Sequence, residues 1–209
     1  MVNGKTDIAY EYIKKKIINW EIPPLTNLSE EQFQKELGFS RTPIREAILR
    51  LGKEGFVYVF PRRAMIVSEV TKDLIEEIYE ARLLNEPHIT VKASQNISKE
   101  WLEDMKKRLT NPPEGLNESE LRTYYMELDW ELHISILEKC ENRFLISEMK
   151  MVHDHNQRIR LKVSKPGMDN SVDEHIAILD AMKSGDKEAI RNAAYVHVLR
   201  SKKISYDTM

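Results

Sequence analysis

The sequence contains a single cysteine, Cys140, which excludes an intramolecular disulfide and is typical of a reducing compartment. It has only 7 glycines and 8 prolines among 209 residues, too few for a low-complexity or loop-rich chain. No apolar run approaches the roughly 20 residues that a membrane span requires. The start of the chain has no apolar core like that of a secretion signal. We therefore expect a cytoplasmic protein that makes no membrane contact.

The chain is rich in residues that suit helices: 41% are hydrophobic and 32% are charged. Its length suits one large domain or two small ones. The formal net charge of −2 lacks the basic excess of a strongly basic nucleic-acid binder. If DNA is the partner, a dimer must gather few phosphate contacts from each subunit.

Residues 28–55 have the pattern of two short helices joined by a sharp corner. Ser29 is placed to cap the first helix in a capping box with Gln32, and Gly38 is placed to end it. Ser40 is placed to cap the second helix, whose first turn tolerates Pro43. The apolar residues at helical spacing are Phe33 and Leu37, then Ile44, Ala47, Ile48 and Leu51. This pattern predicts a helix-turn-helix.

Four polar residues of the second helix are left for its outer faces: Arg41, Thr42, Arg45 and Arg50. A helix inserted in a DNA groove presents its N-terminal residues to base edges and phosphates, which favours DNA binding. An ordinary pair of surface helices carries arginine and glutamate too, so spacing alone leaves both interpretations open.

Two short β-rich runs, at 56–60 and 64–67, flank Pro61, Arg62 and Arg63 and predict a hairpin with a basic tip. The tip arginines either solubilise an exposed turn or contact DNA, and the preceding helices favour DNA.

The rest of the chain reads as helical. A first helix is expected at 7–20, and later helices near 72–95, 98–109, 118–140, 143–165, 172–183 and 186–205. We therefore expect a mainly α protein with a helix-turn-helix domain at 1–70 and an antiparallel all-helical bundle at 71–209.

The bundle carries polar residues on apolar stripes. Asp129 and His133 share the inward stripe of one helix, while His175 and His197 each lie on another. The turn at 184–186 lies midway between His175 and His197, which places them at the same level of a helix pair. One carboxylate and three imidazoles suit one divalent transition metal per subunit, with Zn, Ni and Mn not distinguishable. Alternatively, each histidine is a hydrogen-bonded core residue and Asp129 pairs with His133 or an arginine.

The first half of the chain resembles a known family through the stretch LSEEQFQKELGFSRTPIREAILRLGKEGFV. This stretch is similar to the signature of the GntR family of bacterial transcription regulators, in its FadR-like branch. The chain departs from the family pattern at Pro23-Pro24-Leu25, Glu31, Gln34 and Ala64. The resemblance implies a winged helix-turn-helix, with DNA contacts from Ser40, Arg41, Thr42, Arg45, Arg50, Arg62 and Arg63.

The second half resembles the FCD effector domain of the same branch. The resemblance rests on the residues 129–133 (DWELH), on Glu174-His175 and on His197, and it implies Asp129, His133, His175 and His197 as metal ligands. Residues 79–86 are similar to a helix whose arginine faces the effector cavity. Arg82 is therefore either a carboxylate anchor or the partner of Glu86 four residues on. Arg158 and Arg160 are weaker candidates, and His88, His153 and His155 match no ligand position and are expected to be surface or structural.

Together these features predict a homodimeric transcription regulator, not an enzyme, that binds double-stranded operator DNA and responds to a small organic acid at a metal site. One alternative is a metal-dependent hydrolase. Another is a regulator whose metal is purely structural or is itself the signal.

Overall fold

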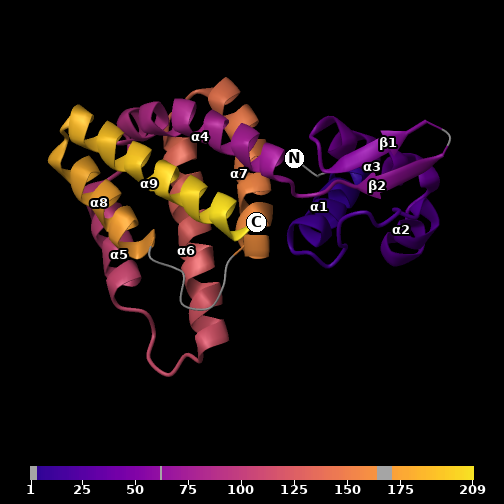
Figure 1. Ribbon diagram of the computed structural model, residues 1–209, viewed down its shortest axis with the longest axis horizontal. Coiled ribbons are helices and arrows are strands. Elements are labelled where there is room, and N and C mark those ends of the chain that lie inside the picture. The colour runs from indigo at the N-terminus through magenta and orange to yellow at the C-terminus, as the bar shows by residue number, and fades with distance from the viewer. Residues whose placement is uncertain (1–3, 62, 164–170) are drawn as a thin grey trace. The chain divides into compact units, whose positions relative to one another are not determined.

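A computed structural model describes residues 4–61, 63–163 and 171–209 (Figure 1). The protein is mainly helical with one two-stranded sheet, as predicted. It forms two compact units, Met1–Thr71 with Gln157–Lys162, and Lys72–Asn156 with Val163–Met209. The elements in chain order are α1 (Lys5–Ile18), α2 (Glu30–Leu37), α3 (Arg41–Lys53), β1 (Val57–Phe60), β2 (Ala64–Val67), α4 (Lys72–Ala93), α5 (Lys99–Thr110), α6 (Glu118–Lys139), α7 (Arg143–Val163), α8 (Ser171–Ser184) and α9 (Lys187–Thr208).

The N-terminal unit packs α3 against α1, α2 and β1. Ser29 Oγ accepts a hydrogen bond from the Gln32 amide at 3.2 Å, and Gly38 ends α2 with a φ of 68°. Ser40 holds the N-cap position of α3, but its side chain makes no capping bond, contrary to the prediction. Its core consists of Ala9, Tyr10, Ile13, Ile17, Ile18, Leu28, Phe33, Ile44, Ala47, Ile48, Leu51, Phe56, Val57 and Val67.

The two strands form the predicted hairpin, antiparallel from the pair Val57–Val67 to the pair Phe60–Ala64. Gly52 in α3 faces β1 so closely that a Cβ there would lie 2.6 Å from Val59 Cγ2. The absence of a side chain at this position lets α3 approach the hairpin.

Helix boundaries agree with the predicted ranges to within a few residues. The first helix ends at Ile18 rather than Trp20, because Trp20 adopts a φ of 61° that cannot continue a right-handed helix. The last helix runs three residues past its predicted end, to Thr208. The predicted end at 165 of the helix beginning at Arg143 lies outside the described residues.

The second unit is an antiparallel helical bundle. In it α9 packs along both α4 and α8, α4 also contacts α6, and α5 contacts α6 and α8 (Figure 1). Its buried apolar residues include Ile75, Tyr79, Ile89, Leu102, Met105, Leu109, Leu132, Ile136, Met149, Ile178, Leu179, Ile190 and Val198. Within the described residues, no helix is long and apolar enough to cross a membrane.

Candidate metal centre and nucleic-acid interface

Three histidines from three helices meet inside the bundle. His133 of α6, His175 of α8 and His197 of α9 each offer a ring nitrogen, and these nitrogens lie within 4.8 Å of one another. The ring centroids of His175 and His197 are 4.7 Å apart, so the two residues do lie at one level of the α8–α9 pair. Two nitrogens bound to one tetrahedral ion at about 2.1 Å lie about 3.4 Å apart, so small adjustments bring the three onto one ion.

Asp129 completes the predicted set from one helical turn before His133. Its Oδ1 lies 3.2 Å from His175 Nε2 and 3.7 Å from His133 Nε2. Both of these nitrogens are buried, and neither makes a hydrogen bond to any described residue. Buried ring nitrogens normally find a partner. A carboxylate and imidazole nitrogens gathered in one buried cluster fit the donor set of a divalent transition metal.

Burial also sets the protonation state of these imidazoles. Removal from water lowers the pKa of His133 and of His197 to about 3, although Asp129 and Glu86 act to raise the first and Glu174 the second. Both rings are therefore neutral near pH 7, which is the form that binds a metal.

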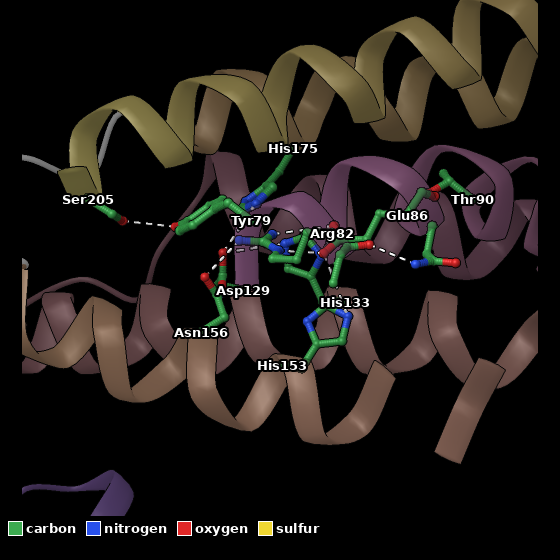
Figure 2. Close-up of polar contacts among 12 residues, drawn as sticks. Tyr79, Arg82, Glu86, Thr90, Asp129, His133, His153, Asn156, His175 and Ser205 are labelled. Carbon is green, nitrogen blue, oxygen red and sulfur yellow. Dashed lines mark hydrogen bonds and ion pairs between the residues drawn. The ribbon is translucent and has the colours of Figure 1, made fainter. Parts of the chain in front are cut away.

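Arg82 of α4 lies in the same polar cluster, and its guanidinium is already paired (Figure 2). Its Nε and Nη2 donate to the Glu86 carboxylate at 2.5 and 3.3 Å, and Nη1 donates to Asn156 Oδ1 at 2.7 Å. Burial would lower the pKa of Arg82, but the Glu86 carboxylate outweighs burial and raises it. The expected pairing with Glu86 is thus present. Of the five N–H donors of a guanidinium, three are used by Arg82 in these bonds to described residues.

A further histidine, His153 of α7, lies in this cluster and was not predicted. Glu86, His133 and His153 form a second group of closely placed donor atoms. His153 Nε2 lies 3.9 Å from Glu86 Oε1, and burial lowers the pKa of His153. Its place on a buried stripe with Met149 and Asn156 was the signal that could have revealed it. His155 is buried as well, whereas His88 is exposed.

Arg158, the weaker candidate for the effector site, makes its hydrogen bonds outside the histidine cluster. It is fully buried and donates to both the hydroxyl and the carbonyl oxygen of Ser68, inside the N-terminal unit. Arg160 is only partly buried. Arg82 is therefore the arginine that lies beside the histidines.

In the N-terminal unit, the start of α3 presents two arginines around a buried carboxylate. Glu30 accepts hydrogen bonds from Arg41 Nε and, at 3.1 Å, from Arg45 Nη1. Glu30 is 8% exposed, while the side chains of Arg41 and Arg45 are 69% and 52% exposed. They line a groove of about 370 Å³ together with Arg63 at the hairpin tip.

The other predicted DNA-contacting residues are arranged differently. Ser40 and Thr42 are exposed beside Arg41. Arg50 stacks over the Tyr10 ring at 3.6 Å and pairs with Asp7 and Glu54. It is therefore held against α1 and does not line the groove, whereas Arg62 lies outside the described residues.

Comparison with known sequences covers both units. Residues 5–67 match the pattern of bacterial regulatory proteins of the gntR family, and residues 77–200 match the FCD domain. The uncharacterized HTH-type transcriptional regulator YdhC of Bacillus subtilis is 26% identical over 190 residues, covering 90% of this chain and 85% of YdhC. The gluconate operon transcriptional repressor of the same organism is 25% identical over 187 residues, covering 86% of this chain and 76% of the repressor.

Solved structures share the fold along the whole chain. Escherichia coli McbR/YncC superposes with a TM-score of 0.80 at 19% identity, covering 99% of both chains. A putative GntR transcriptional regulator from Rhodococcus sp. RHA1 gives a TM-score of 0.76 at 17% identity, covering 99% of this chain and all of the other. At these identities the likeness concerns the fold alone.

Proposed function

The chain belongs to the GntR family of bacterial regulatory proteins and carries an FCD domain, and on this premise we propose that a small carboxylate bound at a metal in the helical unit controls its affinity for operator DNA. The coarser part of this function, a GntR-family transcription regulator with an effector-binding domain, follows from the family itself. Its relatives are transcription regulators rather than enzymes.

The observation that carries the proposal is the convergence of Asp129, His133, His175 and His197 in one buried cluster. Domains of the FCD family often bind metals. Four protein ligands leave a coordination position open on a five- or six-coordinate ion, and the ion would supply positive charge for a carboxylate oxygen there. An apolar pocket without that charge could not offset the cost of removing the carboxylate from water.

Arg82 would bind the other end of the same ligand. Its two remaining N–H donors suit a second oxygen of the acid, while Glu86 keeps the guanidinium oriented. That one relative is named a gluconate operon repressor supports a hydroxylated acid as the first class to test.

For the DNA side, we propose that Ser40, Arg41, Thr42 and Arg45 contact the major groove and that Arg63 contacts DNA from the hairpin. DNA contacts by Arg62 and Arg50 stay predictions. We expect Arg50 to contribute less to DNA binding, because it is held over the Tyr10 ring. A homodimer would place two such surfaces on successive grooves, and the acid would favour one dimer geometry over another.

A second candidate is a regulator whose metal is structural or is itself the signal. It is favoured by the state of Arg82, whose guanidinium is already bonded to Glu86 and Asn156 without any added ligand. The two candidates differ in whether an organic acid changes DNA affinity.

The test uses an operator selected from a random DNA library and read out by fluorescence anisotropy. Protein loaded with metal and freed of excess ion is titrated with gluconate, lactate or succinate, and sorbitol serves as the uncharged match to gluconate. We expect at least one acid, and not sorbitol, to shift operator affinity. The shift should vanish after chelation and in His175→Ala.

Three other outcomes are informative. A shift that survives metal removal refutes coordination of the acid. DNA affinity that responds to metal but to no acid assigns the signal to the metal. Arg82→Gln, compared with the parent at equal metal content as measured by elemental analysis, should weaken the acid response; an unchanged response would remove Arg82 from the acid site.

A further inference from the structure

His197 has a carboxylate beside its Nδ1 ring nitrogen. Glu174 Oε2 lies 3.2 Å from His197 Nδ1 in a buried contact. The other oxygen of Glu174 lies 3.0 Å from Arg200 Nη1. Glu174 is 9% exposed, whereas Arg200 is 63% exposed, so the arginine holds the carboxylate from the surface side.

His133 repeats this arrangement in the interior. Its Nδ1 lies 3.6 Å from Glu86 Oε2, slightly too far for a hydrogen bond. Glu86 in turn is held by Arg82 at 2.5 Å. Two ligand histidines thus each have a glutamate beside Nδ1, and each glutamate has its own arginine.

These contacts determine which nitrogen is left for a metal. An ionised carboxylate only accepts hydrogen bonds, so a ring nitrogen that is hydrogen-bonded to it carries the hydrogen. With hydrogen on Nδ1, the lone pair of His197 is on Nε2. His133 has a carboxylate near each nitrogen, Glu86 at 3.6 Å from Nδ1 and Asp129 at 3.7 Å from Nε2, so a metal bound to Asp129 and Nε2 would leave the hydrogen on Nδ1, beside Glu86. A ring fixed in this tautomer and orientation needs less rearrangement to bind a metal, and the negative charge makes it a stronger ligand.

We propose that Glu174 and Glu86 are positioning residues of the metal centre: Glu174 fixes the Nδ1–H tautomer of His197, and Glu86 favours the Nδ1–H tautomer of His133 once its Nε2 is bound to metal. Arg200 and Arg82 hold the two glutamates. Neither glutamate contacts the metal. Glu174 has the stronger effect of the two, because its contact with the imidazole is the shorter one. The proposal rests on the metal site of the proposed function and adds residues outside its four ligands.

The first experiment measures the tautomers directly in the full-length, metal-free protein. Long-range ¹H–¹⁵N correlation spectra distinguish a histidine protonated on Nδ1 from one protonated on Nε2. We expect Nδ1–H for His197 in the parent. We expect His197 to lose that preference in Glu174→Met and to keep it in Glu174→Gln, whose amide oxygen still accepts a hydrogen bond. An Nε2–H tautomer of His197 in the parent would overturn the proposal, without any variant having to fold.

The second experiment measures metal affinity by competition with a chelating dye, using Zn²⁺ as the probe. Loss of such a partner typically weakens metal binding about 10–100-fold. We expect Glu174→Met to fall in this range, and Glu174→Gln and Glu86→Gln to lose less. The matched control is Glu131→Gln, which breaks a comparable glutamate–arginine pair with Arg108 (2.8 and 2.6 Å) on the same helix as two ligands. It should bind Zn²⁺ as the parent does.

The melting temperature of each variant in excess chelator separates positioning from a general loss of structure. A variant that melts like the metal-free parent but binds Zn²⁺ more weakly supports the proposal. Parent-like Zn²⁺ affinity in a folded Glu174→Met would refute it while leaving the four-ligand site intact. A parent protein that binds no Zn²⁺, Ni²⁺ or Mn²⁺ would instead refute the proposed function, and the tautomer measurement would still report on the glutamates.

Discussion

The two units place their functional side chains in opposite environments. In the N-terminal unit the exposed side chains of Arg41 and Arg45 lie on the surface of an apolar core. In the helical unit, Asp129 and the histidines are enclosed by the helices that carry them. A surface site costs the fold little. A buried polar site opposes folding unless its groups are paired or bound to an ion.

The difference implies that the two units depend on ligands to different degrees. The N-terminal unit has a continuous apolar core, so we expect it to fold without DNA. The helical unit buries Arg82, Glu86 and Asp129 together with the imidazoles, so part of its stability is expected to come from a bound cation.

Metal removal should produce the largest difference in stability between the two units. With free metal at about 1,000 times Kd, binding stabilises the folded state by about 4 kcal/mol, and chelation removes this. Hydrogen-exchange mass spectrometry should show faster exchange in α6, α8 and α9 after chelation and unchanged exchange in α1–α3. His175→Ala should behave like the chelated parent with or without metal. Equal loss of protection in both units would show that their stabilities depend on the metal to the same degree.

A substitution in the N-terminal core should destabilise that unit and leave the helical unit unchanged. Ile48 is fully buried between the helices of that unit, and Ile48→Ala should cost about 2–5 kcal/mol through lost contacts and a cavity. Exchange should quicken in α1–α3, while Zn²⁺ affinity of the helical unit stays at the parent value. Ile8→Ala, at a 44% exposed position of α1, is the matched surface control and should change little. A loss of metal affinity in Ile48→Ala would show that the units do not behave independently.

The contribution of each arginine to operator affinity should depend on its exposure and on its position in the N-terminal unit. Arg45→Ala should cost about 1–3 kcal/mol of operator binding if Arg45 reads a base. Arg50→Ala should cost less, because Arg50 is held over Tyr10 and paired with Asp7 and Glu54. Anisotropy titrations against the selected operator compare the two. A greater loss of operator affinity in Arg50→Ala would show that the groove is not the main DNA-contacting surface.

The smallest effect concerns a partly buried polar contact in the N-terminal unit. Tyr10 donates to Glu54 at 2.6 Å, and burial together with Glu54 raises the pKa of Tyr10 to about 12. Tyr10→Phe should cost about 1–2 kcal/mol near neutral pH. Because the folded state favours the protonated phenol, the stabilisation is complete below pH 10 and is lost as the pH rises through 12. Urea unfolding at pH 8 and pH 11.5 should show the parent and variant converging.

Much of this arrangement is visible in the sequence, because apolar periodicity reports burial. The stripe with Ile44, Ala47 and Ile48 predicted which face of α3 is buried, and it left Arg41 and Arg45 outside. The turn midway between His175 and His197 predicted their common level. Both inferences use only helical geometry within one or two adjacent helices.

Contacts between distant segments were not predictable in this way. Glu30 lies in the first turn of α2, and nothing in its spacing indicates that it is buried beneath two arginines of α3. The stripe of α7 indicates that His153 is buried, but its place beside Glu86 depends on how α7 packs against α4. Glu174 meets His197 only once α8 and α9 are packed. The DNA-contacting, ligand and effector residues themselves stay predictions.

The carboxylate shared by Arg41 and Arg45 bears on how the protein would respond to salt. With Glu30 between them, three charged groups present a net charge of +1 to a duplex, and both long side chains are already ordered. Counterion release follows the charge that a protein brings to the phosphates, with a slope of about −0.9 in log affinity against log salt for each phosphate neutralised. Each subunit should therefore release few ions at this surface. Operator binding would then weaken only gradually with salt, and it would depend more on how well the guanidinium groups fit the bases than on their charge.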